Sequence, residues 1–184
     1  MAAASSRRVA PRAATASLSE SAVTALGAVP HEGQFAFPAS CRLRRPEEFA
    51  AVLAARGPAV LRLARRWLAV SVLASDVSAQ PAELEPVRFG FTVGKRNARR
   101  AVDRNLVKRV LREAARHARP ALAELARARR LSVAVSVRLK APLVAKGEAV
   151  SRTQARRELR AEADALFADL AQRFERLTPG GTGA

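Results

Sequence analysis

The sequence has few of the residues that protein-based catalysis and covalent cross-linking require. Its 184 residues include one cysteine, Cys41, no tyrosine, and two histidines, His31 and His117, that are far apart in the chain. A single cysteine excludes an internal disulfide and a thiolate metal cluster, and is typical of a cytoplasmic protein. Neither histidine lies beside a pair of carboxylates, so the sequence offers few acid–base residues from which a hydrolytic centre could be built. We therefore predict no catalytic residue and no metal site on the chain.

Long apolar runs and acidic residues are also scarce. No run approaches the roughly 20 apolar residues that span a membrane, so we predict no membrane role. The 33 Lys and Arg residues outnumber 16 Asp and Glu residues, which gives a formal net charge of +17 and a pI near 11.8. A charge of this size attracts polyanions, whereas a merely solvated basic surface would repel itself. The composition therefore favours nucleic acid as the partner.

The length suits one domain with tails, because an ordinary core needs about 100–150 residues. Residues 1–40 are rich in Ala, Ser and Pro and have no sustained apolar period, which predicts a disordered basic tail. Residues 177–184 contain proline and several glycines after the last periodic segment, which predicts a flexible C-terminus. A folded domain is expected over residues 41–176.

Apolar periodicity within this domain predicts an α+β fold. Helical segments repeat apolar residues every three to four positions, and strand segments alternate them with polar ones. The expected elements are a helix over 46–57, two strands within 59–74, a loop over 75–86, a strand over 87–93, a helix over 101–119, a further turn or short helix over 120–130, a strand over 131–139 and a long helix over 159–174. The order αβββαβα puts a helix between the third and fourth strands, which permits them to pair in parallel. We predict a sandwich of one four-stranded sheet covered by helices.

The densest charge in the domain lies in the segment KRNARRAVDRNLVKRVLREAAR, residues 95–116, where the only acids are Asp103 and Glu113. On a helical wheel the polar residues of its second part fall within an arc of roughly 140°. They are Arg104, Asn105, Lys108, Arg109, Arg112 and Arg116. The opposite half holds Val102, Leu106, Val107, Val110, Leu111 and Ala114. One face is expected to pack and the other to meet an anion.

An ordinary solvated helix face is the alternative, but such a face usually matches its charges. Arg104, Lys108 and Arg112 repeat their own sign at the i, i+4 spacing, which destabilises an isolated helix. Phosphates would neutralise this repulsion, because arginine and lysine both bind them. Asn105 adds an amide that can hydrogen-bond a base edge, a 2′-hydroxyl or a phosphate. We predict that this face binds a polyanion.

Two segments resemble the protein component of bacterial ribonuclease P. The stretch AVDRNLVKRVLRE, residues 101–113, resembles the so-called RNR segment of that family, and FGFTVGKR, residues 89–96, resembles the strand and loop that precede it. The resemblance extends from about Arg42 to Phe174. It includes the Glu-Phe pair of the first helix, a strand that ends in Arg138 and Lys140, and the final amphipathic helix.

The resemblance implies an enzyme subunit whose RNA partner performs the chemistry. The RNA subunit, with Mg²⁺ bound mainly by RNA, would cut precursor tRNA and remove its 5′ leader, while the protein binds that RNA and the leader and requires no protein partner. A left-handed crossover around the basic helix is also implied. The implied RNA contacts are Arg104, Asn105, Lys108, Arg109 and Arg112, with Arg116 on the same face and Lys95, Arg96, Arg99 and Arg100 lining the approach. The implied leader cleft consists of Phe49, Leu53, Leu68 and Val70.

Two positions depart from the family pattern. Leu106 stands where the pattern has its second arginine, which removes one RNA contact, and it lies near the edge of the apolar arc. Val70 stands in place of an aromatic residue of related proteins. This weakens stacking on the leader, since base–aromatic stacking is worth roughly 1–3 kcal/mol per base.

Other classes of protein use similar features. A structural RNA-binding protein of the ribosomal type would use the basic helix equally well, and charge alone does not distinguish it. The sequence Arg88-Phe89-Gly90-Phe91 faintly resembles the aromatic signature of an RNA-recognition module. That fold has the order βαββαβ, whereas a helix precedes three successive strands in the order expected here. A helix-turn-helix protein needs a second helix just before the basic one, where residues 89–93 are strand-like.

Overall fold

A computed structural model describes residues 37–79, 84–142 and 151–177, all within one compact unit. The predicted tails therefore lie largely outside the described residues. The helices are α1 (Pro46–Ala54), α2 (Ala101–Ala128) and α3 (Arg152–Arg173), the strands are β1 (Val60–Ala64), β2 (Leu68–Asp76), β3 (Val87–Val93) and β4 (Leu131–Leu139), and the 3₁₀ turns are η2 (Ala39–Cys41), η3 (Val77–Ala79) and η4 (Phe174–Arg176). The predicted α+β class and the order αβββαβα are confirmed.

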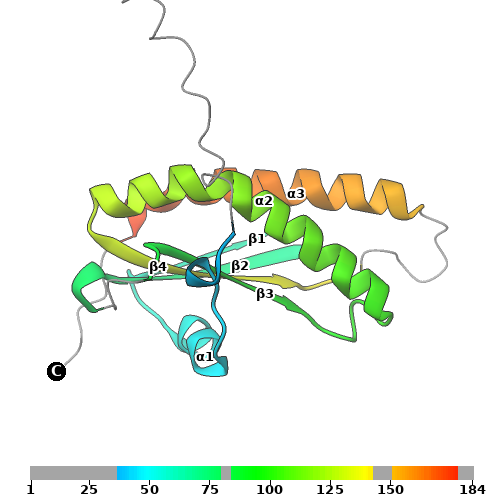
Figure 1. The fold of residues 1–184 in the computed structure, drawn as a ribbon, viewed down its shortest axis with the longest axis horizontal. Helices are drawn as coiled ribbons and strands as arrows, with labels where there is room; N and C mark the ends of the chain where they lie inside the picture. Colours follow the sequence, from blue (N-terminus) through cyan, green and yellow to red (C-terminus); the bar gives the residue numbers. More distant parts are fainter. Residues whose placement is uncertain (1–36, 80–83, 143–150, 178–184) are drawn as a thin grey trace, which may run out of the picture. The chain divides into compact units, whose positions relative to one another are not determined.

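The four strands form one mixed sheet in the order β1-β2-β4-β3. β2 pairs antiparallel with β1 and with β4, whereas β3 pairs parallel with β4, as the helix between them permits. Figure 1 shows α2 and α3 together on one side of the sheet and α1 on the other. The main core lies between the sheet and the α2–α3 pair. There the ring of Phe89 meets Phe167 of α3 edge-on, with centroids 5.8 Å apart.

α2 is longer than the sequence predicts. We expected a helix over 101–119 and a separate turn or short helix over 120–130, but α2 continues through Pro120 to Ala128. Proline removes a hydrogen bond to the preceding turn and usually bends a helix, and the axis of α2 changes direction along its length (Figure 1). Leu122, Ala123 and Ala126 continue the buried stripe beyond the proline. Packing on the core therefore outweighs the local breaker.

The core extends past both predicted limits of the domain, 41–176. Phe37 is buried, and its ring centroid lies 5.9 Å from that of Phe89 and 6.0 Å from that of Phe91. At the other end, Leu177 is also buried. Neither residue belongs to a periodic segment, so the pattern analysis assigned both to tails.

α1 is tied to the sheet by the carboxylate of Glu48. One oxygen, Oε2, accepts hydrogen bonds from the backbone N–H groups of Arg44 at 2.7 Å and Arg45 at 2.9 Å. The other, Oε1, forms an ion pair with Arg88 of β3. Pro46 begins the helix, as predicted. A single acid therefore caps the helix and fixes its position on the sheet.

The ring of Phe49 in α1 lies against Gly90 of β3. A Cβ at position 90 would be 2.3 Å from Phe49 Cε1 and 3.1 Å from the Cβ of Leu43. We expect Gly90→Ala to displace α1 and destabilise the protein by about 1–3 kcal/mol, the range typical of overpacking. Urea unfolding measures the loss. Gly94→Ala is the matched control, because its added Cβ meets nothing within 4 Å, and equal stability of the two variants would contradict the close contact.

Candidate nucleic-acid interface

The loop between β3 and α2 carries the first predicted cations and is fixed to the sheet. Asn97 Nδ2 donates a hydrogen bond to the carbonyl of Leu139 at 2.7 Å. The backbone N–H groups of Asn97 and Ala98 both donate to the carbonyl of Gly94 at 3.1 Å, and Ala98 is buried. The exposed cations of this anchored loop are Lys95, Arg96, Arg99 and Arg100.

Arg104 makes a structural contact that the sequence does not indicate. Its Nη1 donates hydrogen bonds to the carbonyl of Ala98 at 3.2 Å and to that of Arg99 at 2.7 Å. The half-buried guanidinium therefore clamps the loop to the start of α2. Its substitution would disturb the loop as well as any phosphate contact, so Arg104 is a poor probe of RNA binding.

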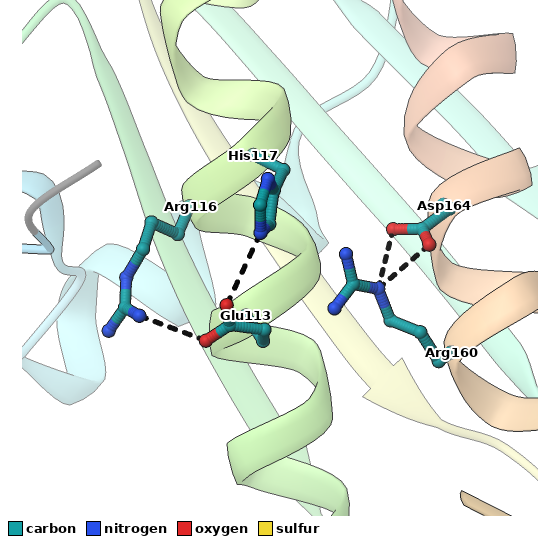
Figure 2. A network of polar contacts seen from close by, with 5 residues as sticks. All are labelled: Glu113, Arg116, His117, Arg160 and Asp164. Carbon is teal, nitrogen blue, oxygen red and sulfur yellow. Dashed lines mark hydrogen bonds and ion pairs between the residues drawn. The ribbon is translucent and has the colours of Figure 1, made fainter. Parts of the chain in front are cut away.

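The middle of the basic face has unmatched charge. Asn105, Arg109 and Arg112 are exposed and Lys108 is half-buried. Within the described ranges, the three cations among them form no ion pair. Arg116 differs, because it pairs with Glu113 at 2.9 Å (Figure 2). Of the predicted RNA contacts on α2, the central three cations therefore have the most freedom to bind a ligand.

The apolar half of α2 packs as predicted, with one exception. Val107, Val110 and Leu111 are buried against the core, and Leu106 is half-buried, as expected near the edge of the apolar arc. Val102 was predicted to pack but is 61 % exposed. It lies in the first turn of α2, before the buried stripe begins.

The four residues predicted to line the leader cleft do not share one surface. Leu68 and Val70 are buried in the main core, on the side of the sheet covered by α2 and α3. Phe49 and Leu53 belong to α1, on the other side of the sheet, where Phe49 is half-buried and Leu53 is 46 % exposed. The predicted cleft is therefore wrong as a set.

Strand alternation explains this correction. Successive side chains of a strand point to opposite faces of the sheet. Gly90, which contacts Phe49, pairs with Ser136 of β4, and Ser136 pairs with Ser71 of β2. Ser71 and the other odd-numbered residues of β2 therefore face α1. Val70 and the other even-numbered residues of β2 face the main core.

A basic hollow beside the loop was not assigned to the site from the sequence. It has a volume of about 510 Å³ and is lined by Arg96, Asn97, Arg138, Leu139, Lys140, Ala141 and Pro142. The parallel register brings these segments together, since Thr92 pairs with Arg138 near the ends of β3 and β4. The predicted parallel pairing was the signal that could have placed Arg138 and Lys140 beside the loop.

Among the residues that the structure describes, no three His, Cys, Asp or Glu side chains are grouped so that they could hold a metal ion. Of the helices that the structure describes, none has the length and apolar character to cross a membrane.

The chain matches the family described as Ribonuclease P over residues 37–146. It is 42 % identical over 137 residues to the ribonuclease P protein component of Bordetella avium, an alignment that covers 73 % of this chain and 95 % of that protein. The corresponding protein of Bordetella parapertussis is 39 % identical over 140 residues, with the same coverage. A solved structure of the Staphylococcus aureus RNase P protein covers 75 % of this chain and 98 % of its own, at 16 % identity and a TM-score of 0.42.

The family match covers most of the folded domain, and these Bordetella relatives align along nearly their whole length. The chain belongs to the ribonuclease P protein component family.

Proposed function

We propose that this chain is the protein subunit of ribonuclease P. It binds the catalytic RNA and the 5′ leader of precursor tRNA, and promotes endonucleolytic removal of the leader to give the mature 5′ end. The observation that carries the proposal is a row of cations on α2 that form no ion pair with a described residue, Lys108, Arg109 and Arg112, beside an anchored basic loop in a member of this family. The RNA supplies the catalytic centre and binds most of the Mg²⁺.

The contribution of the protein is charge and position. Cations on α2 and its loop reduce the repulsion between the phosphates of the catalytic RNA and those of the substrate, and release counterions when they bind. Because Asn97 bonds the loop to the end of β4, the backbone that carries the loop cations is held in place before RNA arrives. Affinity should therefore fall steeply with salt concentration.

The leader lies on the α1 side of the sheet in this proposal. Phe49 and Leu53 supply apolar surface on α1. Ser71 and Arg138 lie on the same face of the sheet as the α1 contact, and Arg138 is exposed where it can meet a leader phosphate. This surface keeps the two α1 residues of the predicted cleft and excludes its two core residues.

The alternative, a structural RNA-binding protein of the ribosomal type, makes a different prediction. We would measure binding of the full chain to ribonuclease P RNA from the same organism and to a ribosomal RNA fragment of equal length, over a range of salt concentrations. We expect the ribonuclease P RNA to bind at least about tenfold more tightly at high salt, where non-specific binding weakens. Equal affinities, or tighter binding to the ribosomal fragment, would contradict the proposal.

Removal of the Phe49 ring should affect substrates with a leader selectively. We expect Phe49→Ala to lower the affinity of the enzyme for precursor tRNA with a long leader about tenfold, a loss within the range for one base–aromatic stack. The affinity for leaderless tRNA should change little. Val77→Ala, which shortens an exposed apolar side chain in η3, is the control. Circular dichroism and thermal melting must first show a folded variant. Equal losses for both substrates would place the leader elsewhere.

A further inference from the structure

A groove between α2 and α3 is lined by arginines from both helices. It has a volume of about 340 Å³, and its walls include Arg109 of α2 and Arg156 and Arg160 of α3. A second hollow on α3, of about 530 Å³, shares Arg156 and Arg160 and adds Arg157. The basic face of α2 therefore continues across the groove onto α3.

Arg160 is held in position with its outer donors open. Its Nε donates hydrogen bonds to Asp164 Oδ1 at 2.9 Å and Oδ2 at 2.7 Å. Figure 2 shows the guanidinium between the two helices, with its terminal nitrogens directed toward α2. Those nitrogens bond no residue in the part of the chain that the structure describes. A guanidinium fixed in this way can donate two parallel hydrogen bonds to a phosphate.

Two acids line the groove and the second hollow, Glu113 and Asp164, and both are already engaged. Glu113 contacts Arg116 at 2.9 Å through one oxygen and His117 at 3.2 Å through the other (Figure 2). Asp164 is paired with Arg160. The groove therefore keeps an excess of positive charge. Of the four arginines that line the groove and the second hollow, Arg109, Arg156 and Arg157 form no ion pair with a described residue.

Three arginines of α3 carry the same charge at helical spacing, and only Arg152 and Arg160 among them have an acidic partner in the described residues, Asp103 and Asp164. Arg152, Arg156 and Arg160 repeat the same charge at the i, i+4 spacing, which destabilises a helix. An anion bound between Arg156 and Arg160 would offset this repulsion.

We propose that the α2–α3 groove is a second RNA phosphate site, in which Arg156 and Arg160 bind the backbone of the same catalytic RNA that lies on α2. This inference rests on the proposed function, because Arg109 belongs to both surfaces. An RNA backbone fits better than a small anion, since it presents successive phosphates to cations that are spread over two helices.

The test compares Arg156→Gln/Arg160→Gln with the unmodified full chain in binding to ribonuclease P RNA. We expect the Kd to rise about tenfold and the slope of log K against log salt to fall by about 1–2. Arg156→Gln alone should raise the Kd about threefold, and it leaves the Arg160–Asp164 pair intact. Arg173→Gln removes an exposed arginine at the other end of α3 and should change neither quantity.

Three other results would contradict the groove site, the proposed function or the assignment to catalytic RNA. Unchanged affinity in the double variant, with a loss in Lys108→Ala, would overturn the groove site alone, whereas unchanged affinity in both would overturn the proposed function. An equal loss in Arg173→Gln would mean that net charge accounts for the effect and would overturn the site. A loss for precursor tRNA, with none for ribonuclease P RNA, would overturn the assignment to catalytic RNA.

Discussion

Replacement of Lys108, Arg109 and Arg112 by alanine should weaken binding to ribonuclease P RNA about 100- to 1,000-fold, because each change removes a phosphate contact worth about 1–1.5 kcal/mol. The slope of log K against log salt should fall by about 2–3. The three side chains form no ion pair within the described ranges and are exposed or half-buried, so the fold should survive their loss. Filter binding across a salt series measures both quantities.

The matched control removes the same charge elsewhere. Arg44, Arg173 and Arg176 are exposed and lie away from α2 in the sequence. Their combined replacement by alanine should lower affinity only by the small amount that a change in net charge causes. A loss as large as that of the α2 variant would contradict a specific role for the face of α2.

Glu48→Gln should destabilise the protein by about 2–3 kcal/mol at neutral pH, somewhat below the range for breaking a fully buried ion pair. Burial opposes ionisation of this carboxyl, but the backbone N–H groups of Arg45 and Arg44 and the guanidinium of Arg88 outweigh it and hold the pKa of Glu48 below its ordinary value. The side chain of Arg88 is only 9 % exposed, so glutamine would leave its charge buried without a counter-charge. Urea unfolding at pH 7 measures the difference.

The stability difference between the unmodified chain and Glu48→Gln should depend on pH in one direction. A carboxyl whose pKa is lower in the folded state stabilises the fold above its unfolded pKa, and this stabilisation is lost as the pH falls through the folded pKa. The ordinary pKa of a glutamate carboxyl is 4.5, so the advantage of glutamate over glutamine should be full at pH 7 and should shrink as the pH falls below that value and through the lower folded pKa. A difference that stays constant between pH 7 and pH 3 would contradict the role of its charge.

Local patterns predicted most of the fold, because they depend on short-range periodicity. The alternation of Val133, Val135 and Val137 predicted β4, and the Arg65-Arg66 pair predicted the break between β1 and β2. The family resemblance placed Val70 in the leader cleft, and periodicity could not correct this, because it does not show which face of β2 each helix covers. Nor could it show that α2 passes through Pro120, since the stabilisation comes from tertiary packing.

The candidate site, like the fold, was predictable only where its signal lies within one segment of the sequence. Charge and helical spacing predicted the basic face of α2 because that signal lies within one segment. Arg156 and Arg160 gave no comparable signal, because α3 was recognised from its buried side, and the groove exists only where two helices pack together. The clamp made by Arg104 also depends on the folded path of the loop.

The most direct measurement of the central claim is the rate at which ribonuclease P RNA from the same organism cleaves a precursor tRNA at low magnesium, with and without the full chain. We predict that the chain alone does not cut, that the RNA alone cuts slowly, and that the mixture cuts faster and leaves the mature 5′ end. Cleavage by the chain alone, or a mixture no faster than the RNA alone, would contradict the account.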